Sequence, residues 1–335
     1  MDFSEQIGRR LKLQDLHVFM AVVQAGSMGK AAQRLNTTQP AISRGIAELE
    51  NAIGVRLLDR SHQGVEPTTY GRALLHCAAA VFDDLRQGVR NIEFLSDPTL
   101  GEIRIGGDEA IIAGLLSTVL GQLRRRYPGI TVHMMNVGPL ADQYRELRER
   151  RIDLVLGRLA PKIEIENDIQ TQILYQDHLL VVAGLHSRWS TRRKVDLSEL
   201  ANEPWGLPSS DTPAGPLVRE AFRARGISLR GAATGSPHLL LYLLPKGPFL
   251  VTLPDSVLKF GTNLPPFKVL PVELPISPWP VGIMTLKNRT ISPVAQLFLD
   301  CVCEVVKPPL QRNSRPTGSA TAREFLGRKS SSDRV

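Results

Sequence analysis

The first part of the chain shows apolar positions at helical spacing, separated by short polar turns. A first helix carries them at steps of three and four, at Leu16, Phe19, Met20 and Val23. Gly26 ends this helix, and Ser27 is placed to cap a second one with its side-chain oxygen. The inner face of the second helix consists of Ala31, Ala32 and Leu35. The pattern predicts two short helices that pack against each other.

A third helix is predicted in the run NTTQPAISRGIAELE, after the tight turn at Asn36. Thr38 is placed as its N-cap, and Pro40 occupies the first turn, where its missing N–H has no intrahelical partner. At about 100° per residue, one narrow stripe is apolar and must pack inward: Ile42, Ile46, Leu49 and Ile53. The outward residues are small or form hydrogen bonds: Gln39, Pro40, Ser43, Arg44 and Ala47. Such a face suits the major groove of DNA, and an ordinary solvated helix face has the same pattern.

Two short alternating runs around Gly64, in VRLLDRSHQGVEPTT, predict a β-hairpin after the third helix. Arg56, Arg60 and His62 lie on or beside the hairpin and can contact phosphates. Three helices and a hairpin make a winged helix-turn-helix, which is predicted for residues 1–70.

A long helix is predicted from Thr69 to Ser96. Its apolar residues recur at steps of three and four, at Leu74, Ala78, Val81, Leu85, Val89 and Ile92. A helix about 40 Å long cannot bury this seam against a small wing domain alone. Residues 71–97 are therefore predicted to be a linker helix that pairs with the same helix of a second subunit.

Strands and helices alternate beyond Pro98, which predicts an α/β domain over residues 101–306. The run GEIRIGGDEAIIAGLLSTVLGQLRRRYPGITVHMMN reads as strand, helix and strand. This alternation favours a mainly parallel sheet covered by helices. Further on, ILYQDHLLVVAG reads as one long apolar strand, and 293–306 as a last helix.

Composition and charge predict a disordered C-terminal tail and the cellular location. The chain has 335 residues and a formal net charge of +8. Residues 1–100 hold 11 basic and 11 acidic side chains, residues 101–306 hold 23 and 20, and residues 307–335 hold 7 and 2. The basic excess thus lies mostly in a Pro/Ser/Arg-rich tail that is predicted to be disordered, because it has little apolar surface to bury. No apolar run approaches the roughly 18 residues of a membrane span, and no signal peptide is evident, so a cytoplasmic location is expected.

The chemistry-bearing residues do not indicate an enzyme. Cys77, Cys301 and Cys303 are not spaced for zinc, and residues two apart on a helix point away from each other. The seven His are scattered, and the chain lacks H-E-x-x-H, G-x-S-x-G and a glycine-rich phosphate loop. We therefore expect no catalytic activity, no metal and no cofactor.

The run from Leu13 to about Leu75 resembles the DNA-binding domain of the LysR-type transcriptional regulators. It contains AGS-x-x-x-AA-x-x-L, T-Q-P-A-I-S-R, L-E-x-x-I-G-V-x-L-x-x-R and a closing T-x-x-G. The resemblance implies groove contacts at Gln39, Pro40, Ser43 and Arg44. It implies phosphate contacts at Ser27, Thr38 and wing residues near Arg60. Family wings often read R-G-V where this chain has Gln63-Gly64-Val65. The resemblance therefore implies one fewer contact to the DNA backbone here, and His62 is the residue that can replace it.

The order of elements beyond residue 100 resembles the effector domain of the same family, which has a periplasmic-binding-protein type 2 architecture. This implies lobe I at 101–172 and 276–306, lobe II at 173–275, and a cleft between them. Ligands in open α/β sheets bind beyond the carboxyl ends of strands. The candidate effector contacts at such positions are Gly107, Asp108, Glu109, Ala110, Arg158, Ser209, Ser210, Asp211, Ser236 and His238. Ser and Asp at these turns also serve as plain N-caps.

Asp108 and Glu109 stand where many relatives have Ser or Thr, and two acids repel a carboxylate unless Arg158 compensates. This favours a neutral polyol or sugar-like effector, or a polar ligand with a cationic group. Stabilisation only by aromatic or dicarboxylic acids in a thermal-shift screen would contradict it.

The sequence as a whole predicts a one-component, effector-responsive transcription factor. We expect it to form a homotetramer, to bind double-stranded operator or promoter DNA and a small-molecule effector, with RNA polymerase as a further possible partner. Two alternatives from other classes are a cysteine-based redox-responsive regulator, which needs a resolving cysteine pair, and a solute-binding protein. A solute-binding protein would need an export signal where this chain has residues 1–97.

Overall fold

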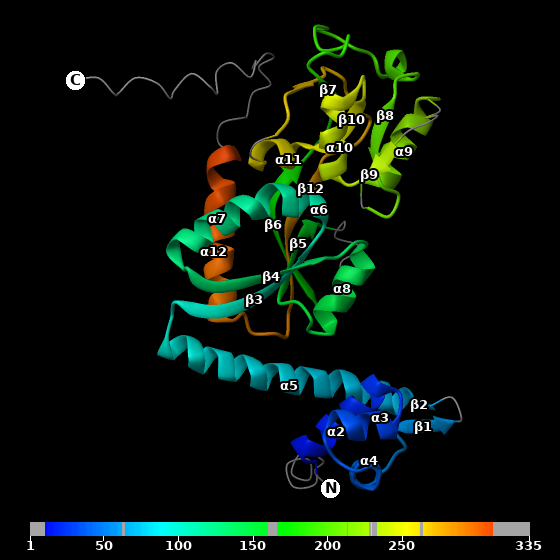
Figure 1. The fold of residues 1–335 in the computed structure, drawn as a ribbon, viewed down its shortest axis with the longest axis vertical. Coiled ribbons are helices and arrows are strands. Elements are labelled where there is room, and N and C mark those ends of the chain that lie inside the picture. The colour runs from blue at the N-terminus through cyan, green and yellow to red at the C-terminus, as the bar shows by residue number, and fades with distance from the viewer. Residues whose placement is uncertain are drawn as a thin grey trace, which may run out of the picture. The chain divides into compact units, whose positions relative to one another are not determined.

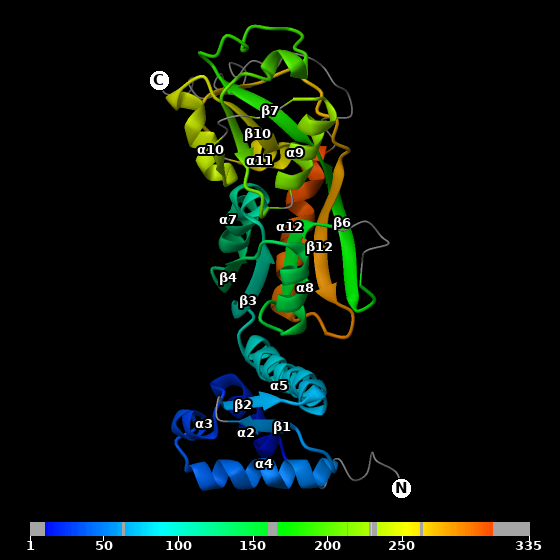
Figure 2. The same ribbon diagram turned by 90° about the vertical axis from the view of Figure 1, so that its right-hand side faces the viewer.

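The computed structural model describes residues 11–61, 64–159, 166–212, 214–227, 229, 233–261 and 264–310. The chain divides into two compact units, Met1–Ile92 and Glu93–Val335. Each unit has its own fold, drawn in Figures 1 and 2.

The first unit contains three helices, a hairpin and the long helix. Its elements are α2 (Leu13–Ala25), α3 (Met28–Arg34), α4 (Gln39–Ile53), β1 (Leu58–Ser61), β2 (Gly64–Pro67) and α5 (Thr69–Ser96). The core is built from the positions that the helical pattern predicted, with Phe19, Ala31, Ile42, Ile46 and Leu49 all buried. Both views place α2 and α3 between α4 and α5 (Figures 1 and 2). The helix α4 therefore presents its outer face at the end of the unit away from α5.

Side-chain hydrogen bonds join the hairpin to the helices on either side of it. The Glu50 carboxylate, on α4, accepts from the backbone N–H groups of Leu57 (2.7 Å) and Leu58 (3.2 Å). The Thr68 hydroxyl donates to the carbonyl of Arg56 (2.9 Å) and accepts from the N–H of Gly71 (3.0 Å). These bonds fix the orientation of the hairpin relative to α4.

Gly71 allows α5 to start directly behind the hairpin. A Cβ at this position would lie 2.0 Å from the carbonyl oxygen of Leu57, and backbone cannot yield that far. The closing T-x-x-G of the sequence motif thus has a steric cause.

Lobe I of the second unit is a five-stranded sheet between two layers of helices. Its strands are β3 (Leu100–Gly107), β4 (Gly129–Asn136), β5 (Leu154–Arg158), β6 (Ile169–Asp177) and β12 (Trp279–Leu286), in the order β4-β3-β5-β12-β6. Its helices are α6 (Glu109–Ile111), the π-helical turn η1 (Ile112–Leu116), α7 (Ser117–Arg126), α8 (Leu140–Arg148) and α12 (Pro293–Leu310). Figure 1 shows α7 and α12 together on one side of the sheet and α8 on the other.

Lobe II is a second five-stranded sheet, in the order β11-β7-β10-β8-β9. Its strands are β7 (Leu179–Gly184), β8 (Trp205–Pro208), β9 (Ala233–Gly235), β10 (Leu250–Pro254) and β11 (Phe267–Val269). Its helices are η3 (Leu197–Leu200), α9 (Gly215–Ala224), α10 (Pro237–Leu243), η4 (Leu244–Lys246) and α11 (Asp255–Phe260). Val182 and Val251 pack on α10, whereas Val181 and Leu250 face the core that includes Phe222 of α9, as strand alternation requires.

The structure corrects the prediction of one long strand in ILYQDHLLVVAG. Residues up to Asp177 belong to β6 of lobe I, and residues from Leu179 belong to β7 of lobe II. The crossover between the lobes therefore lies at His178, six residues after the predicted boundary at 172. An apolar run has the same appearance whether it stays in one sheet or passes between two, since both sheets bury it.

The sheets are also mixed, not mainly parallel as predicted. In lobe I β3 pairs in parallel with β4 and β5, but β12 pairs antiparallel with β5 and β6. Lobe II combines parallel β8 pairs with antiparallel β7 pairs. The antiparallel pairs arise because β6 leaves lobe I and β12 returns to it from lobe II, so β12 enters the sheet in the direction opposite to its neighbours β5 and β6.

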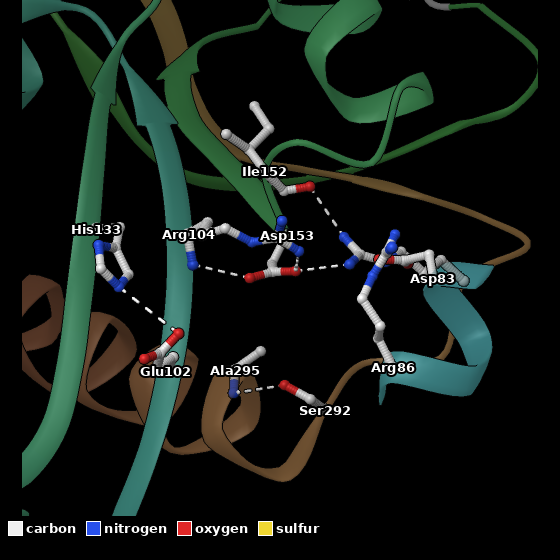
Figure 3. A network of polar contacts seen from close by, with 10 residues as sticks. Asp83, Arg86, Glu102, Arg104, His133, Ile152, Asp153, Ser292 and Ala295 are labelled. Atoms are coloured by element: carbon white, nitrogen blue, oxygen red, sulfur yellow. Dashed lines mark hydrogen bonds and ion pairs between the residues drawn. The ribbon is translucent and has the colours of Figure 1, made fainter. Parts of the chain in front are cut away.

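A cluster of charged residues joins the start of β5 to β3 in lobe I. The Asp153 carboxylate accepts from the backbone N–H of Arg104 (2.7 Å) and from its guanidinium (3.3 Å), as Figure 3 shows. The Arg289 guanidinium donates to Asp153 (2.6 Å) and to the carbonyl of Ile152 (2.9 Å). Burial alone would raise the pKa of Asp153, but the two arginines and the Arg104 N–H together hold that pKa below its usual value.

The last helix is longer than predicted. α12 continues to Leu310, so the tail predicted from 307 begins with a further helical turn, because buried Val305 and Val306 hold this end of the helix on the lobe I core. The rest of the predicted tail lies outside the described residues. Within the described part of the chain, no helix combines the length and apolar character needed to cross a membrane.

Candidate recognition helix and inter-lobe cavity

The helix α4 begins as its sequence predicts. Thr38 is the N-cap, and its hydroxyl accepts from the N–H of Ala41 at 3.4 Å. Pro40 lies in the first turn, and Gly54 ends the helix in the left-handed region (φ 83°). Because Ile42, Ile46 and Leu49 anchor one face in the core, the opposite face is free to meet a partner.

The predicted groove residues lie on this outer face. Gln39, Pro40 and Arg44 are exposed, and Ser43 is partly exposed. Ser27 caps α3 by accepting from the N–H of Lys30 (3.1 Å). Arg56 and Arg60 are exposed at the hairpin. His62 and its neighbour Gln63 lie outside the described residues.

A cavity of about 430 Å³ lies between the two lobes of the second unit. Part of its lining consists of residues at or just after the carboxyl ends of parallel strands, where α/β folds bind ligands. Asp108 follows β3, Asn136 ends β4 and Arg158 ends β5 in lobe I. Pro208 ends β8 and Gly235 ends β9 in lobe II. The volume suits a small organic molecule.

Seven of the ten predicted effector residues line this cavity: Asp108, Glu109, Ala110, Arg158, Ser209, Asp211 and Ser236. The other three lie elsewhere. Gly107 sits beneath it, where a Cβ would approach the Leu156 carbonyl oxygen to 2.8 Å. Ser210 lines a neighbouring hollow beside α9. His238 is exposed, with its ring 5.0 Å from that of Tyr242 on the same helix.

Sequence reasoning missed six polar or aromatic residues of the lining: Asn136, Asp177, Thr212, Thr252, Ser256 and Trp279. Asn136 ends a predicted strand and could have been found by the rule used for Asp108. Asp177 and Thr252 were hidden inside runs that read as core strands. Trp279 carried no local signal, because its position depends on the return crossover from lobe II.

Asp108 and Arg158 form a charged pair in the cavity wall. The Asp108 carboxylate caps α6 by accepting from the N–H of Ile111 (3.0 Å). Its pKa is raised, first by burial and further by the like charge of Asp177, while Arg158 and two backbone N–H groups oppose the shift. Burial lowers the pKa of Arg158 and the charge of Asp108 opposes this shift. A guanidinium stays protonated in proteins, so Arg158 is charged. That guanidinium lies 4.6 Å from the ring centre of Trp279, at cation–π distance.

Asp177 is the most buried carboxylate of the cavity. It accepts from the N–H (3.0 Å) and the hydroxyl (2.5 Å) of Ser256, and from the N–H of His178 (3.0 Å). Its pKa is nevertheless raised, because burial outweighs these hydrogen bonds and Asp255 adds a like charge. The cavity thus holds a carboxylate whose ionisation is costly in the folded protein.

This cost predicts that Asp177→Asn stabilises the protein. A folded-state pKa above the unfolded value means that the folded chain binds more protons, so stability falls as pH rises through the folded pKa. We expect a higher Tm for the variant at about pH 7.5, and a smaller difference towards the ordinary Asp pKa of about 4. Thermal unfolding of wild type and variant across this pH range measures the difference in Tm. Asp196→Asn is the matched control, because hydrogen bonds to Ser198 lower the pKa of that exposed capping Asp and its loss should not raise the Tm. A lower Tm for Asp177→Asn at neutral pH would contradict the assignment.

No disulfide joins the three cysteines, all of which lie in the described part of the chain. Cys77, Cys301 and Cys303 are all free, and burial raises the pKa of the Cys301 thiol above its usual value. A reactive thiol needs the opposite shift. The partly exposed Cys303 sulfur lies 3.9 Å from the amide nitrogen of Gln172.

The two parts of the chain match the two domains of one family. Residues 13–72 match the model described as "Bacterial regulatory helix-turn-helix protein, lysR family", and residues 96–307 match "LysR substrate binding domain". The chain therefore belongs to the LysR family. It is a DNA-binding transcriptional regulator of the LysR type with an effector-binding domain.

Curated relatives match over nearly the whole chain. The HTH-type transcriptional regulator TdcA of Escherichia coli (strain K12) is 28% identical over 297 residues, which cover 88% of this chain and 93% of the relative. The transcriptional dual regulator GltC of Bacillus subtilis (strain 168) is 27% identical over 300 residues, covering 88% and 97%. These relatives are transcriptional regulators by description.

Solved structures share the fold. Full-length CbnR in complex with its target DNA has a TM-score of 0.59 at 22% identity, covering 88% of this chain and 100% of that one. A full-length cysteine variant of OxyR from Pseudomonas aeruginosa has a TM-score of 0.60 at 20% identity, covering 89% and 95%.

Proposed function

We propose that this regulator reads DNA through α4 and the β1–β2 hairpin, and that a small molecule in the inter-lobe cavity controls its activity. The cavity carries this proposal, since it lies between two lobes that can close on a ligand. Closure would change the geometry between subunits and hence the bending of DNA held at two half-sites. As the domain assignment we propose residues 1–70 for DNA binding, 71–97 for dimerisation and 101–306 for effector binding.

The DNA contacts we propose divide into two kinds. Gln39, Pro40, Ser43 and Arg44 meet base edges in the major groove, where amide and guanidinium groups can form paired hydrogen bonds. Phosphate contacts come from Ser27, Thr38 and the wing residues Arg56, Arg60 and His62. The exposure of the described members of both sets, over a buried apolar face, supports this division.

The proposed effector contacts are the seven predicted residues of the lining together with Asp177, Thr252 and Trp279. The proposed assembly is a dimer through α5, which exposes Leu85, Val89, Ile92 and Leu95 in the isolated chain, with two dimers paired through the effector lobes as a homotetramer. We further propose that the protein is not an enzyme and works in the cytoplasm, where DNA and RNA polymerase are accessible.

The proposed DNA recognition is tested by selection from a random duplex library with the full-length chain. We expect recovery of a recurrent sequence with two related half-sites, since two recognition helices on a symmetric dimer read matching sequences. Footprinting should then protect both half-sites. Recovery of unrelated sequences, bound with equal affinity to random DNA, would overturn the proposal.

A further inference from the structure

The charge in the inter-lobe cavity is unbalanced. Among the described residues of its lining, four side chains are acidic and one is basic: Asp108, Glu109, Asp177 and Asp211, against Arg158. Asp177 is buried, Asp108 and Glu109 are partly buried, and Asp211 is exposed. Buried charges in proteins are normally paired with an opposite charge. A ligand that brings positive charge would complete this pairing, and an anionic ligand would worsen the imbalance.

The helix N-termini at the cavity are already in use. Four helices have N-cap residues in the lining, namely α6, α9, α10 and α11. In each, a first-turn N–H donates to a protein oxygen: Ile111 to Asp108 (3.0 Å), Gly215 to Thr212 (3.3 Å), Leu239 to Ser236 (3.3 Å) and Ser256 to Asp177 (3.0 Å). One first-turn N–H of each helix is therefore engaged by the protein, in two cases by a carboxylate, which leaves fewer of the groups that bind anions in such folds.

The single cationic side chain of the described lining is also engaged. Arg158 lies over Trp279 and is attracted to Asp108. The donors that the described residues supply to Asp177 are neutral, namely the N–H and hydroxyl of Ser256 and the N–H of His178. Asp177 is 3% exposed, so solvent compensates its charge poorly. The cationic group that the cavity lacks belongs beside Asp177.

A second observation points to a ligand independently of charge. Thr252, on β10, is 0% exposed and lines the cavity, yet its hydroxyl has no hydrogen-bond partner among the described residues. A buried hydroxyl without a partner is costly, and native structures rarely leave one unsatisfied. A polar group of a bound molecule would satisfy it.

We propose that the effector is a small organic cation, whose ammonium group binds at the Asp177 carboxylate beside Asp108 and whose second polar group hydrogen-bonds to the Thr252 hydroxyl. This inference rests on the proposed function, in which the cavity is the effector site. It names the ligand class by chemistry: aliphatic amines, diamines and amino alcohols that fit about 430 Å³.

The test compares matched ligands on the full-length chain by thermal shift and calorimetry. One set is putrescine, butane-1,4-diol and succinate, and a second is ethanolamine, ethylene glycol and glycolate. Within each set length is nearly constant and charge changes from positive to neutral to negative. We expect at least one amine to raise the Tm and to bind, and its neutral and anionic partners to do neither.

Three variants place the binding amine in the cavity. Asp177→Asn should weaken binding at least about thirtyfold, because a desolvated charge pair is lost while the side-chain shape remains. Thr252→Val should weaken it about fivefold and raise the Tm of the ligand-free protein, since an unpaired hydroxyl is removed. Asp196→Asn is the matched control outside the cavity and should bind as the wild type does.

The outcomes separate this inference from the proposed function. Binding of the diol or dicarboxylate with no binding of amines overturns the cationic class, and leaves the effector cavity in place. Failure of every amine in both sets also overturns it. Amine binding that is unchanged in Asp177→Asn and Thr252→Val overturns the site. The duplex-library selection tests DNA recognition separately, so its outcome does not depend on which ligands bind or on the cavity variants.

Discussion

Ser43→Ala and Gln39→Ala are expected to relax base preference, whereas Arg60→Ala is expected to weaken binding to every sequence. Ser43 and Gln39 lie on the outer face of α4, and a side chain that pairs well with a base edge contributes about 1–3 kcal/mol of discrimination. Arg60 lies on the hairpin, and a lost phosphate contact lowers the salt dependence of binding by about one charge. Competition of selected against random duplex at several salt concentrations measures both effects.

The controls are two substitutions of the same kind away from the proposed interface. Gln296→Ala removes an exposed glutamine from α12, and Arg145→Ala removes an exposed arginine from α8. Neither should change specificity or salt dependence. Equal losses on selected and random DNA for Ser43, Gln39 and Arg60 variants would show that the outer face of α4 does not read bases.

Arg289→Met is expected to destabilise the effector-binding unit by about 3–5 kcal/mol. The side chain of Arg289 is 5% exposed and that of Asp153 is 14% exposed, so their contact is shielded from water. Methionine leaves the Asp153 carboxylate buried, with Arg104 as its remaining charged neighbour, and removes the hydrogen bond to Ile152. Chemical denaturation at neutral pH measures the loss.

The pH dependence identifies the cause of that loss. The folded-state pKa of Asp153 is lowered by its arginine neighbours. The ionised Asp153 therefore stabilises the fold fully above the unfolded pKa of about 4, and this stabilisation disappears as the pH falls through the folded-state pKa. The difference between wild type and Arg289→Met should therefore narrow below about pH 4. Arg145→Met breaks an ion pair of 2.8 Å whose arginine is 57% exposed, and should cost less than about 1 kcal/mol. Equal effects of the two substitutions would show that burial of the Asp153 pair is not what matters.

The DNA-binding unit was predictable because its signals are local. Thr38 and Ser27 cap helices through bonds to residues three positions on, and the stripe of Ile42, Ile46 and Leu49 follows from helical period alone. The bounds of α5, Thr69–Ser96, agree with the sequence pattern for the same reason. These features need no knowledge of distant parts of the chain.

The effector cavity was predictable only where the relevant residues directly follow a recognisable strand. Asp108 and Arg158 could be found by that rule. The rule also selected Gly107, Ser210 and His238, which lie at such turns but outside the lining, because a turn position does not determine the direction of a side chain.

The sequence by itself determined the helices and caps of the DNA-binding unit, its hairpin and the face that α4 presents, since each depends on residues within a few positions of one another; the alternation of strands and helices also gave the α/β class. Only the tertiary structure decided where the chain crosses between the lobes, and with it that Asp177, Thr252 and Trp279 meet in one cavity. Those residues lie on β6, β10 and β12, in runs that look like core strands. Their side chains line a cavity instead of the core because they face the opposite lobe, and the packing of the two sheets determines which side chains do so.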